Sequence, residues 1–168
     1  LLFLPFLSGE RAPYWNAQAR GSFFGIGLHH KREHFIRAVL EGILFSVYSI
    51  GIALRDLAGG AKEIRASGGF ARSKEWRQIM SDMFGYEVLI PESHESSSFG
   101  AALLAMHALG ALDNLHDVKK MIHISHRHEP DLERSSMYLE LFYIYERVYY
   151  NLLEEYKLIA KFQKQLNN

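Results

Sequence analysis

The sequence predicts an α/β fold in which a mixed sheet is flanked by helices and followed by a long C-terminal helix. Segments with strand-like and helix-like periodicity alternate along the chain, as they do in α/β proteins. Hydrophobic residues make up 48% of the 168 residues and aromatic residues 13%, which is sufficient for one domain with a core. Glycine or proline stands where most of the predicted elements end. Together these features predict a globular protein rather than a disordered one.

Each predicted element has its own pattern. Strands are expected where short apolar runs are bounded by turn residues, at 1–7, 21–28, 63–66 and 87–90. Helices are expected where apolar residues recur at helical spacing, at 34–57, 73–84, 99–109 and 131–165. The first helix should be buried on more than one side, and its Glu41 should pair with Arg37 one turn back. The last helix should pack on its own domain and reach toward a neighbour.

Composition excludes several kinds of site and partner. Lys plus Arg equals Asp plus Glu, at 19 each, so no basic surface for nucleic acid is expected. The sequence contains no cysteine, which excludes disulfides and thiolate metal sites and suits a cytoplasmic location. No apolar run approaches the ~20 residues of a membrane helix, so no membrane partner is expected. His123, His126 and His128 lie in a segment predicted to be irregular, where a solvated loop is favoured over a metal site.

Two short segments are candidates for ligand contact. The stretch 64–73 runs from a short strand into Gly68 and Gly69, and a helix opens near Ser73. Glycines let a ligand approach the backbone, and a helix start offers unpaired N–H groups at the edge where nucleotides bind in α/β sheets. From this stretch alone, a plain strand-to-helix turn is equally compatible. The loop 8–20 either packs on its own Tyr14 and Trp15 or contacts a ligand.

The segment 21–41 resembles the second signature of the FGGY family of carbohydrate kinases. It reads Gly-Ser-Phe-Phe-Gly-Ile at 21–26 and His-Phe-Ile-Arg-Ala-Val-Leu-Glu at 34–41. Three further segments look like family motifs: the loop ahead of the signature, the adenosine motif and the segment that closes around the nucleotide, at 4–13, 67–73 and 91–102. Within the family, the loop and the adenosine motif look most like those of gluconate kinases, with xylulokinases the near runner-up.

The resemblance implies a ribonuclease H-like, actin-like ATPase lobe that holds ATP. Residues 1–168 would be most of the C-terminal kinase domain, with 131–165 a helical tail, and the first lobe and the start of this domain would lie upstream. Gly69 and Ser73 would lie against the adenosine, while Gly68 and Phe70 shape its pocket. The catalytic aspartate would belong to the first lobe, so no catalytic residue or metal ligand is expected in this chain. The chain alone would be inactive.

The resemblance also implies a reaction and its participants. ATP with Mg²⁺ would phosphorylate a sugar-acid hydroxyl, converting D-gluconate to 6-phosphogluconate, with xylulose or another sugar as the alternative substrate. Expected partners are the nucleotide, the sugar acid and the protein's own N-terminal lobe, with a homodimer as a further candidate. A hypothesis of another class is a non-catalytic actin-like module that self-associates through its tyrosine-rich helix.

Overall fold

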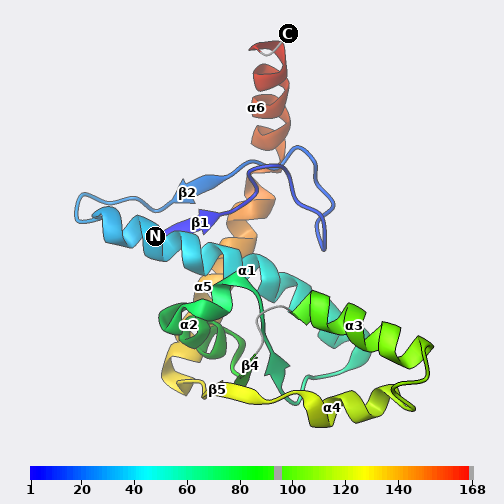
Figure 1. Cartoon of the computed structure of the whole chain (residues 1–168). Coiled ribbons are helices and arrows are strands. Elements are labelled where there is room, and N and C mark those ends of the chain that lie inside the picture. Colours follow the sequence, from blue (N-terminus) through cyan, green and yellow to red (C-terminus); the bar gives the residue numbers. More distant parts are fainter. Residues whose placement is uncertain (93–95, 167–168) are drawn as a thin grey trace. The chain divides into compact units, whose positions relative to one another are not determined.

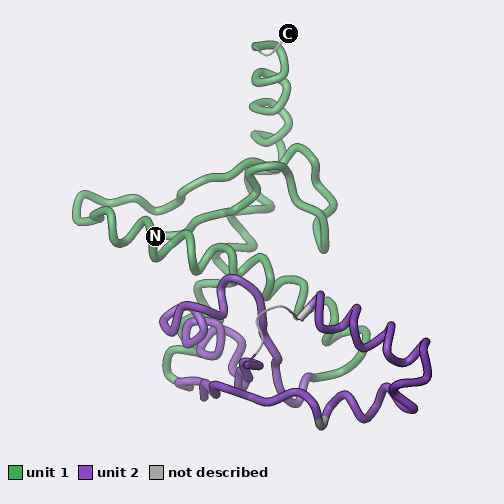
Figure 2. Tube along the Cα trace, in the orientation of Figure 1, with its two compact units in different colours: residues 1–60, 133–168 green, residues 61–132 purple. Residues whose placement is uncertain are grey.

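The computed structural model describes residues 1–92 and 96–166, which divide into two compact units. Unit 1 comprises residues 1–60 and 133–168, and unit 2 comprises residues 61–132 (Figure 2). Unit 1 contains a two-stranded sheet and unit 2 a three-stranded sheet, each accompanied by helices. The α/β prediction is therefore confirmed, although the strands are divided between two small sheets.

Unit 1 begins with two short antiparallel strands that pack on a long helix. β1 (Leu2–Leu4) pairs with β2 (Ser22–Phe24), and Leu2 lies opposite Phe24. β1 packs on α1 (Arg32–Ala58), as Figure 1 shows. Gly59 ends this helix with a φ of 84° and a ψ of 177°, an extended positive-φ conformation that glycine adopts without steric cost. The predicted helix is confirmed, and the first two predicted strands are shorter than expected.

Aromatic side chains form the core of unit 1 between α1 and α5 (Leu132–Asn151). The ring of Phe45 lies 5.9 Å from that of Phe142 and 5.3 Å from that of Tyr145, measured between centroids. All three side chains are fully buried. Burying an aromatic side chain removes a large apolar area from water, so this cluster holds the two helices together.

The predicted Arg37–Glu41 pair is confirmed and is part of a larger network. Arg37 Nε donates to Glu41 Oε1 at 2.6 Å. The hydroxyl of Tyr138 donates to the same carboxylate oxygen at 2.9 Å and accepts from Arg37 at 2.7 Å. Burial and the adjacent Glu41 carboxylate raise the pKa of Tyr138 to about 12. The carboxylate is thus satisfied by α1 and α5 together.

The predicted C-terminal helix is divided into α5 and α6 (Leu153–Leu166). Leu152 separates them, and its N–H donates to the carbonyls of both Val148 and Tyr149, at 3.1 and 3.2 Å. Such a shared hydrogen bond tightens one helical turn without removing it. Tyr149 and Tyr156 are buried on either side of this point. The expectation of one uninterrupted helix is therefore corrected to two helices that follow each other directly.

Unit 2 contains a mixed sheet in the order β3-β4-β5. β3 (Ile64–Arg65) runs parallel to β4 (Val88–Pro91), and β5 (Ile124–His128) runs antiparallel to β4. The other elements of unit 2 are helical: η1 (Gly69–Arg72), α2 (Lys74–Phe84), α3 (Ser96–Ala108), η2 (Leu115–Asp117) and α4 (Val118–Met121). Residues 93–95, part of the predicted polar loop before α3, lie outside the described residues.

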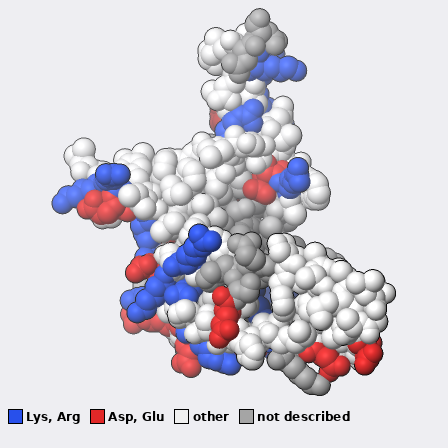
Figure 3. All heavy atoms as spheres, in the orientation of Figure 1, with Lys and Arg blue, Asp and Glu red and all other residues white. Residues whose placement is uncertain are grey.

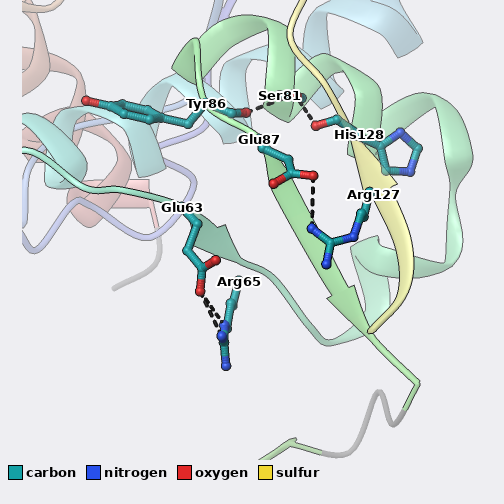
Figure 4. A network of polar contacts seen from close by, with 7 residues as sticks. All are labelled: Glu63, Arg65, Ser81, Tyr86, Glu87, Arg127 and His128. Atoms are coloured by element: carbon teal, nitrogen blue, oxygen red, sulfur yellow. Dashed lines mark hydrogen bonds and ion pairs between the residues drawn. The ribbon is translucent and has the colours of Figure 1, made fainter. Parts of the chain in front are cut away.

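His126 and His128 lie on a strand, and His123 directly precedes it, which corrects the prediction of an irregular loop. β5 pairs with β4, and Arg127 of β5 forms an ion pair at 3.1 Å with Glu87, which directly precedes β4 (Figure 4). The Ser81 hydroxyl lies within hydrogen-bond distance of the backbone carbonyls of Tyr86 and His128, at 2.9 and 2.7 Å. Pairing with a buried neighbour strand is a tertiary effect that overrides weak local strand propensity.

α1 requires a second correction. By length and composition it is apolar enough to cross a membrane, although the sequence suggested that no run was long enough. Ala38, Leu44 and Phe45 are buried, while Leu54 and Leu57 are exposed. Because Leu44 and Phe45 point about 100° apart around the helix, burial extends to more than one of its sides, as expected. The core helix of a soluble protein passes the same composition test, so the absence of a membrane partner stays a prediction.

Candidate functional site

The candidate site is the turn between β3 and α2. Ala66 extends the pairing of β3, because its N–H donates to the carbonyl of Leu89 at 3.0 Å. Two residues later, Gly68 adopts φ 96° and ψ −169°. This backbone region is occupied almost entirely by glycine, since a Cβ would clash there. The turn from strand to helix therefore requires glycine at position 68.

The two glycines leave bare backbone at the surface of unit 2. Apart from the chain neighbours of each glycine, a Cβ placed on either Gly68 or Gly69 would meet no described heavy atom within 4 Å. Gly69 is exposed and Gly68 is half-buried. A flat ligand ring could therefore approach the peptide groups directly.

Phe70 forms one side of the turn. Its ring packs edge-to-face on Trp76 of α2, with centroids 5.7 Å apart and an interplanar angle of 87°. The next residue, Ala71, is fully buried and anchors η1. This contact fixes the position of the Phe70 ring relative to the first turn of α2. It provides an apolar surface beside the bare glycine backbone.

Ser73 caps α2. Its Oγ accepts from the Trp76 backbone N–H at 3.2 Å and donates to Glu75 Oε2 at 3.1 Å. The pKa of Glu75 is lowered, first by a hydrogen bond from the backbone N–H of Glu75 itself and then by the bond from the Ser73 hydroxyl. The lowered pKa keeps this carboxylate charged. A negative group at the helix start opposes phosphate and neutralises the positive dipole end. This turn therefore suits the nucleoside end of a nucleotide better than the phosphate end.

Two acidic residues that follow this turn in the sequence make contacts elsewhere in unit 2. Asp82 is buried, and its Oδ1 accepts from Gln78 Nε2 at 2.8 Å and from the Asp131 backbone N–H at 3.0 Å. Glu92 is exposed, and its backbone N–H donates to the His123 carbonyl at 3.0 Å. Over residues 1–92 and 96–166, no group of acidic and histidine side chains could hold a metal ion. The turn therefore has the chemistry of a binding site without a general base.

The structure places the four predicted residues on one continuous turn, but it also contains grooves elsewhere. Three grooves of about 740, 650 and 600 Å³ lie in unit 1, and none of them is lined by Gly68, Gly69, Phe70 or Ser73. One of them includes Trp15, whose side chain is 76% exposed. Tyr14, by contrast, packs on Tyr149. Packing therefore accounts for Tyr14 but not for Trp15, and ligand contact by the loop 8–20 stays a prediction.

A strand, a glycine turn and a capped helix in a mixed α/β unit define a candidate nucleotide-binding protein. The pattern of the FGGY family of carbohydrate kinases, C-terminal domain, matches residues 1–109. The chain belongs to this family.

Relatives and a solved structure agree with this assignment. The chain is 45% identical over 169 residues to gluconokinase of Bacillus licheniformis, covering 100% of this chain and 33% of that protein. It is 37% identical over 150 residues to xylulose kinase of Staphylococcus epidermidis, covering 89% and 30%. The crystal structure of gluconate kinase from Lactobacillus acidophilus matches with a TM-score of 0.86 and 33% identity, covering 95% and 32%. The chain thus spans about a third of the length of the curated relatives it matches.

Proposed function

We propose that the protein containing this chain is an ATP-dependent kinase that converts D-gluconate to 6-phosphogluconate. The observation that carries the proposal is the similarity to a gluconokinase along the whole chain. The weaker similarity to a xylulose kinase supports xylulose as the second candidate substrate. In either case the chemistry is transfer of the γ-phosphoryl group of ATP to a sugar hydroxyl.

Within this reaction, the chain would hold the adenosine. The base would lie on the bare backbone of Gly68 and Gly69 beside the Phe70 ring, and Ser73 would contact the nucleoside from the helix start. The Ser73 hydroxyl already caps α2, so a contact with the ribose would be shared with that role. The charged Glu75 carboxylate next to this turn would direct the phosphates away from it.

The remaining parts of the reaction belong to residues outside this chain. Phosphoryl transfer depends mainly on positioning and on charge neutralisation. Because the described residues offer no cluster of metal ligands, Mg²⁺ would be bound by the nucleotide phosphates and by residues of the other lobe. An aspartate of that lobe would accept the proton of the sugar hydroxyl. Closure of the two lobes would exclude water, which competes as a phosphoryl acceptor.

The same proposal extends to the architecture and location of the protein. We infer that residues 1–168 form most of the C-terminal domain of an actin-like, ribonuclease H-like ATPase, with 131–165 as its helical tail. Its direct partner would be its own N-terminal lobe, and a homodimer is a further proposal. The absence of cysteine and a formal net charge of zero are compatible with the cytoplasm and with no nucleic-acid partner. On the face shown in Figure 3, basic and acidic side chains are interspersed.

A substrate panel on the full-length protein tests the proposed reaction. ATP consumption should be measured with D-gluconate, D-xylulose and glycerol at matched concentrations, with a protein-free reaction as the control. Gluconate should give the largest kcat/KM. Activity on xylulose without activity on gluconate would replace the first candidate by the second. A folded full-length protein that binds ADP but phosphorylates none of the three would overturn both candidate substrates.

A further inference from the structure

One groove of unit 1 has the composition of a carbohydrate-binding site. Its volume is about 650 Å³, within the range of small-molecule sites. It lies between the loop that joins β1 to β2 and the adjoining parts of α5 and α6. The side chains that carry the argument come from all three elements: Trp15 and Gln18, Tyr149 and Tyr150, Glu154 and Lys157.

Trp15 is exposed in a way that core packing does not explain. Its side chain is 76% exposed, and its ring contacts no other aromatic ring among the described residues. Its φ is 49°, and it is the one non-glycine residue with a positive φ in the described part of the chain. Its backbone N–H donates to the Arg11 carbonyl, which holds the turn in place. A bulky residue in this backbone region is strained, and such residues cluster at binding sites.

The wall beside Trp15 is rigid. The rings of Tyr14 and Tyr149 stack with centroids 4.1 Å apart and an interplanar angle of 28°. The Tyr14 hydroxyl lies 3.2 Å from Ser49 Oγ, and Asn16 Nδ2 donates to the Tyr149 hydroxyl at 3.3 Å. Both rings are therefore fixed by hydrogen bonds as well as by packing. A ligand that enters this groove meets a surface that needs little ordering.

The polar groups at the edge of the groove complement a ring of hydroxyls. The Tyr150 side chain is 56% exposed, and Gln18 is also exposed, so an amide and a phenol are accessible there. Lys157 Nζ and Glu154 Oε1 form an ion pair at 2.6 Å, which adds a charged donor and a charged acceptor. A pyranose has a face of C–H groups that packs on aromatic rings and a periphery of hydroxyls that both donate and accept.

We propose that this groove binds a monosaccharide in its ring form, with one C–H face of the sugar on Trp15 and its hydroxyls on Tyr150 and Gln18. The proposal rests on residues of unit 1 alone. It does not depend on the adenosine assignment in unit 2 or on gluconate as the phosphoryl acceptor, since gluconate is an open chain. Failure of either proposal would leave the other standing.

Fluorine NMR on the full-length protein tests this site directly. Tryptophan is replaced by 5-fluorotryptophan, and the Trp15 signal is assigned with Trp15→Phe. Titration with methyl α-D-glucopyranoside should shift the Trp15 signal saturably and leave the Trp76 signal unchanged. A Trp15 signal that moves only in proportion to sugar concentration, or not at all, would overturn the proposal, including the case in which another part of the protein covers the groove.

A matched pair of tyrosine variants tests whether sugar binding depends on the groove or on any exposed tyrosine of α5. Tyr150→Leu should weaken sugar binding about tenfold, because it removes a hydroxyl and an aromatic edge. Tyr143→Leu is the control, since Tyr143 lies on the same helix with 57% exposure, against 56% for Tyr150, and does not line the groove. Thermal unfolding of each variant checks that both are folded. Equal affinity of the two variants would also contradict the proposed site.

Discussion

Glycine has opposite structural roles in α1 of unit 1 and in the turn of unit 2. A Cβ on Gly42 would lie 2.1 Å from the backbone oxygen of Phe3, so β1 packs directly on the helix backbone there. A Cβ on Gly68 or Gly69 would meet no described heavy atom within 4 Å other than those of its chain neighbours. The first glycine is required because protein occupies the adjacent space, and the other two border space that the described protein leaves empty.

This difference teaches that a glycine in a motif is not by itself a ligand contact. Gly42 follows directly after the signature-like segment 34–41, and Gly68 and Gly69 lie in the adenosine-like motif. The sequence analysis assigns no role to Gly42, and its close contact with β1 is seen only in the structure. Substitutions at these positions should therefore affect different quantities, protein stability where the glycine packs on protein and ligand affinity where it borders open space.

The largest expected effect is on stability at Gly42. Gly42→Ala would gain about 1 kcal/mol of helix propensity but lose about 3 kcal/mol through the clash with β1. The melting temperature should fall by about 4–8 °C. Gly100→Ala is the control, because Gly100 is also helical but has no atom within 4 Å of an added Cβ. Equal melting temperatures of Gly42→Ala and wild type in differential scanning calorimetry would show that β1 does not pack as described.

The next largest expected effect is a difference in stability between alanine variants of the two glycines in the turn. Gly68→Ala should cost about 1–2 kcal/mol, because its φ of 96° with ψ −169° is unfavourable for any residue with a Cβ. Gly69→Ala should change the free energy of unfolding by less than about 0.5 kcal/mol. Urea denaturation of the two variants measures this difference. Equal losses of unfolding free energy in the two variants would show that Gly68 is not specifically required by its backbone conformation.

A third test concerns ligand binding rather than stability. Gly69→Trp would place an indole where the adenine is proposed to lie, so ADP affinity should fall at least tenfold, about 1.4 kcal/mol. Isothermal titration calorimetry on the full-length protein is the measurement. Gly69→Ala is the control and should retain most of the affinity. Unchanged affinity of the Trp variant, with the fold intact, would exclude adenosine from this turn.

The smallest effect is pH-dependent and lies in the sheet that supports the turn. Burial, and then the positive charges of Arg77, His126 and Lys74, lower the pKa of His128, while Asp82 opposes this shift. The His128 Nδ1 lies 3.1 Å from Gln78 Oε1, and its buried Nε2 has no partner among the described residues. A proton on Nε2 would therefore be buried without an acceptor.

The sign of the pH effect follows from this lowered pKa. Above the ordinary pKa of about 6.5, both the folded and the unfolded state are neutral at His128, and its contribution to stability is complete. As pH falls below about 6.5, the unfolded state takes up the proton first, and stability is lost until the folded pKa is passed. His128→Gln should reduce the loss of unfolding free energy between about pH 7 and about pH 5. If the unfolding free energy of the variant falls with pH as steeply as that of the wild type, His128 does not titrate differently in the folded and unfolded states.

Patterns in the sequence were sufficient to predict the structural features that depend on residues close together in the chain. The helix at α1, its Arg37–Glu41 pair and the strand–turn–helix around Gly68 were all predicted, because each depends on residues within a few turns of one another. β5 and the division at Leu152 were not predicted, since β5 forms only by pairing with β4 and the division depends on one locally tightened turn. The Trp15 groove was also missed, because loop and helix residues more than a hundred positions apart meet there.

The sequence by itself determined the α/β class, the family and the residues of the candidate adenosine turn, because these are encoded in periodicity and in contiguous motifs. Only the tertiary structure decided which glycine borders open space and which is in close contact with a strand, since that depends on atoms brought from elsewhere in the chain. The exposure of Trp15 beside buried Tyr149 was decided in the same way. Neighbours in space, rather than neighbours in sequence, determine whether a side chain or a bare backbone is available to a ligand.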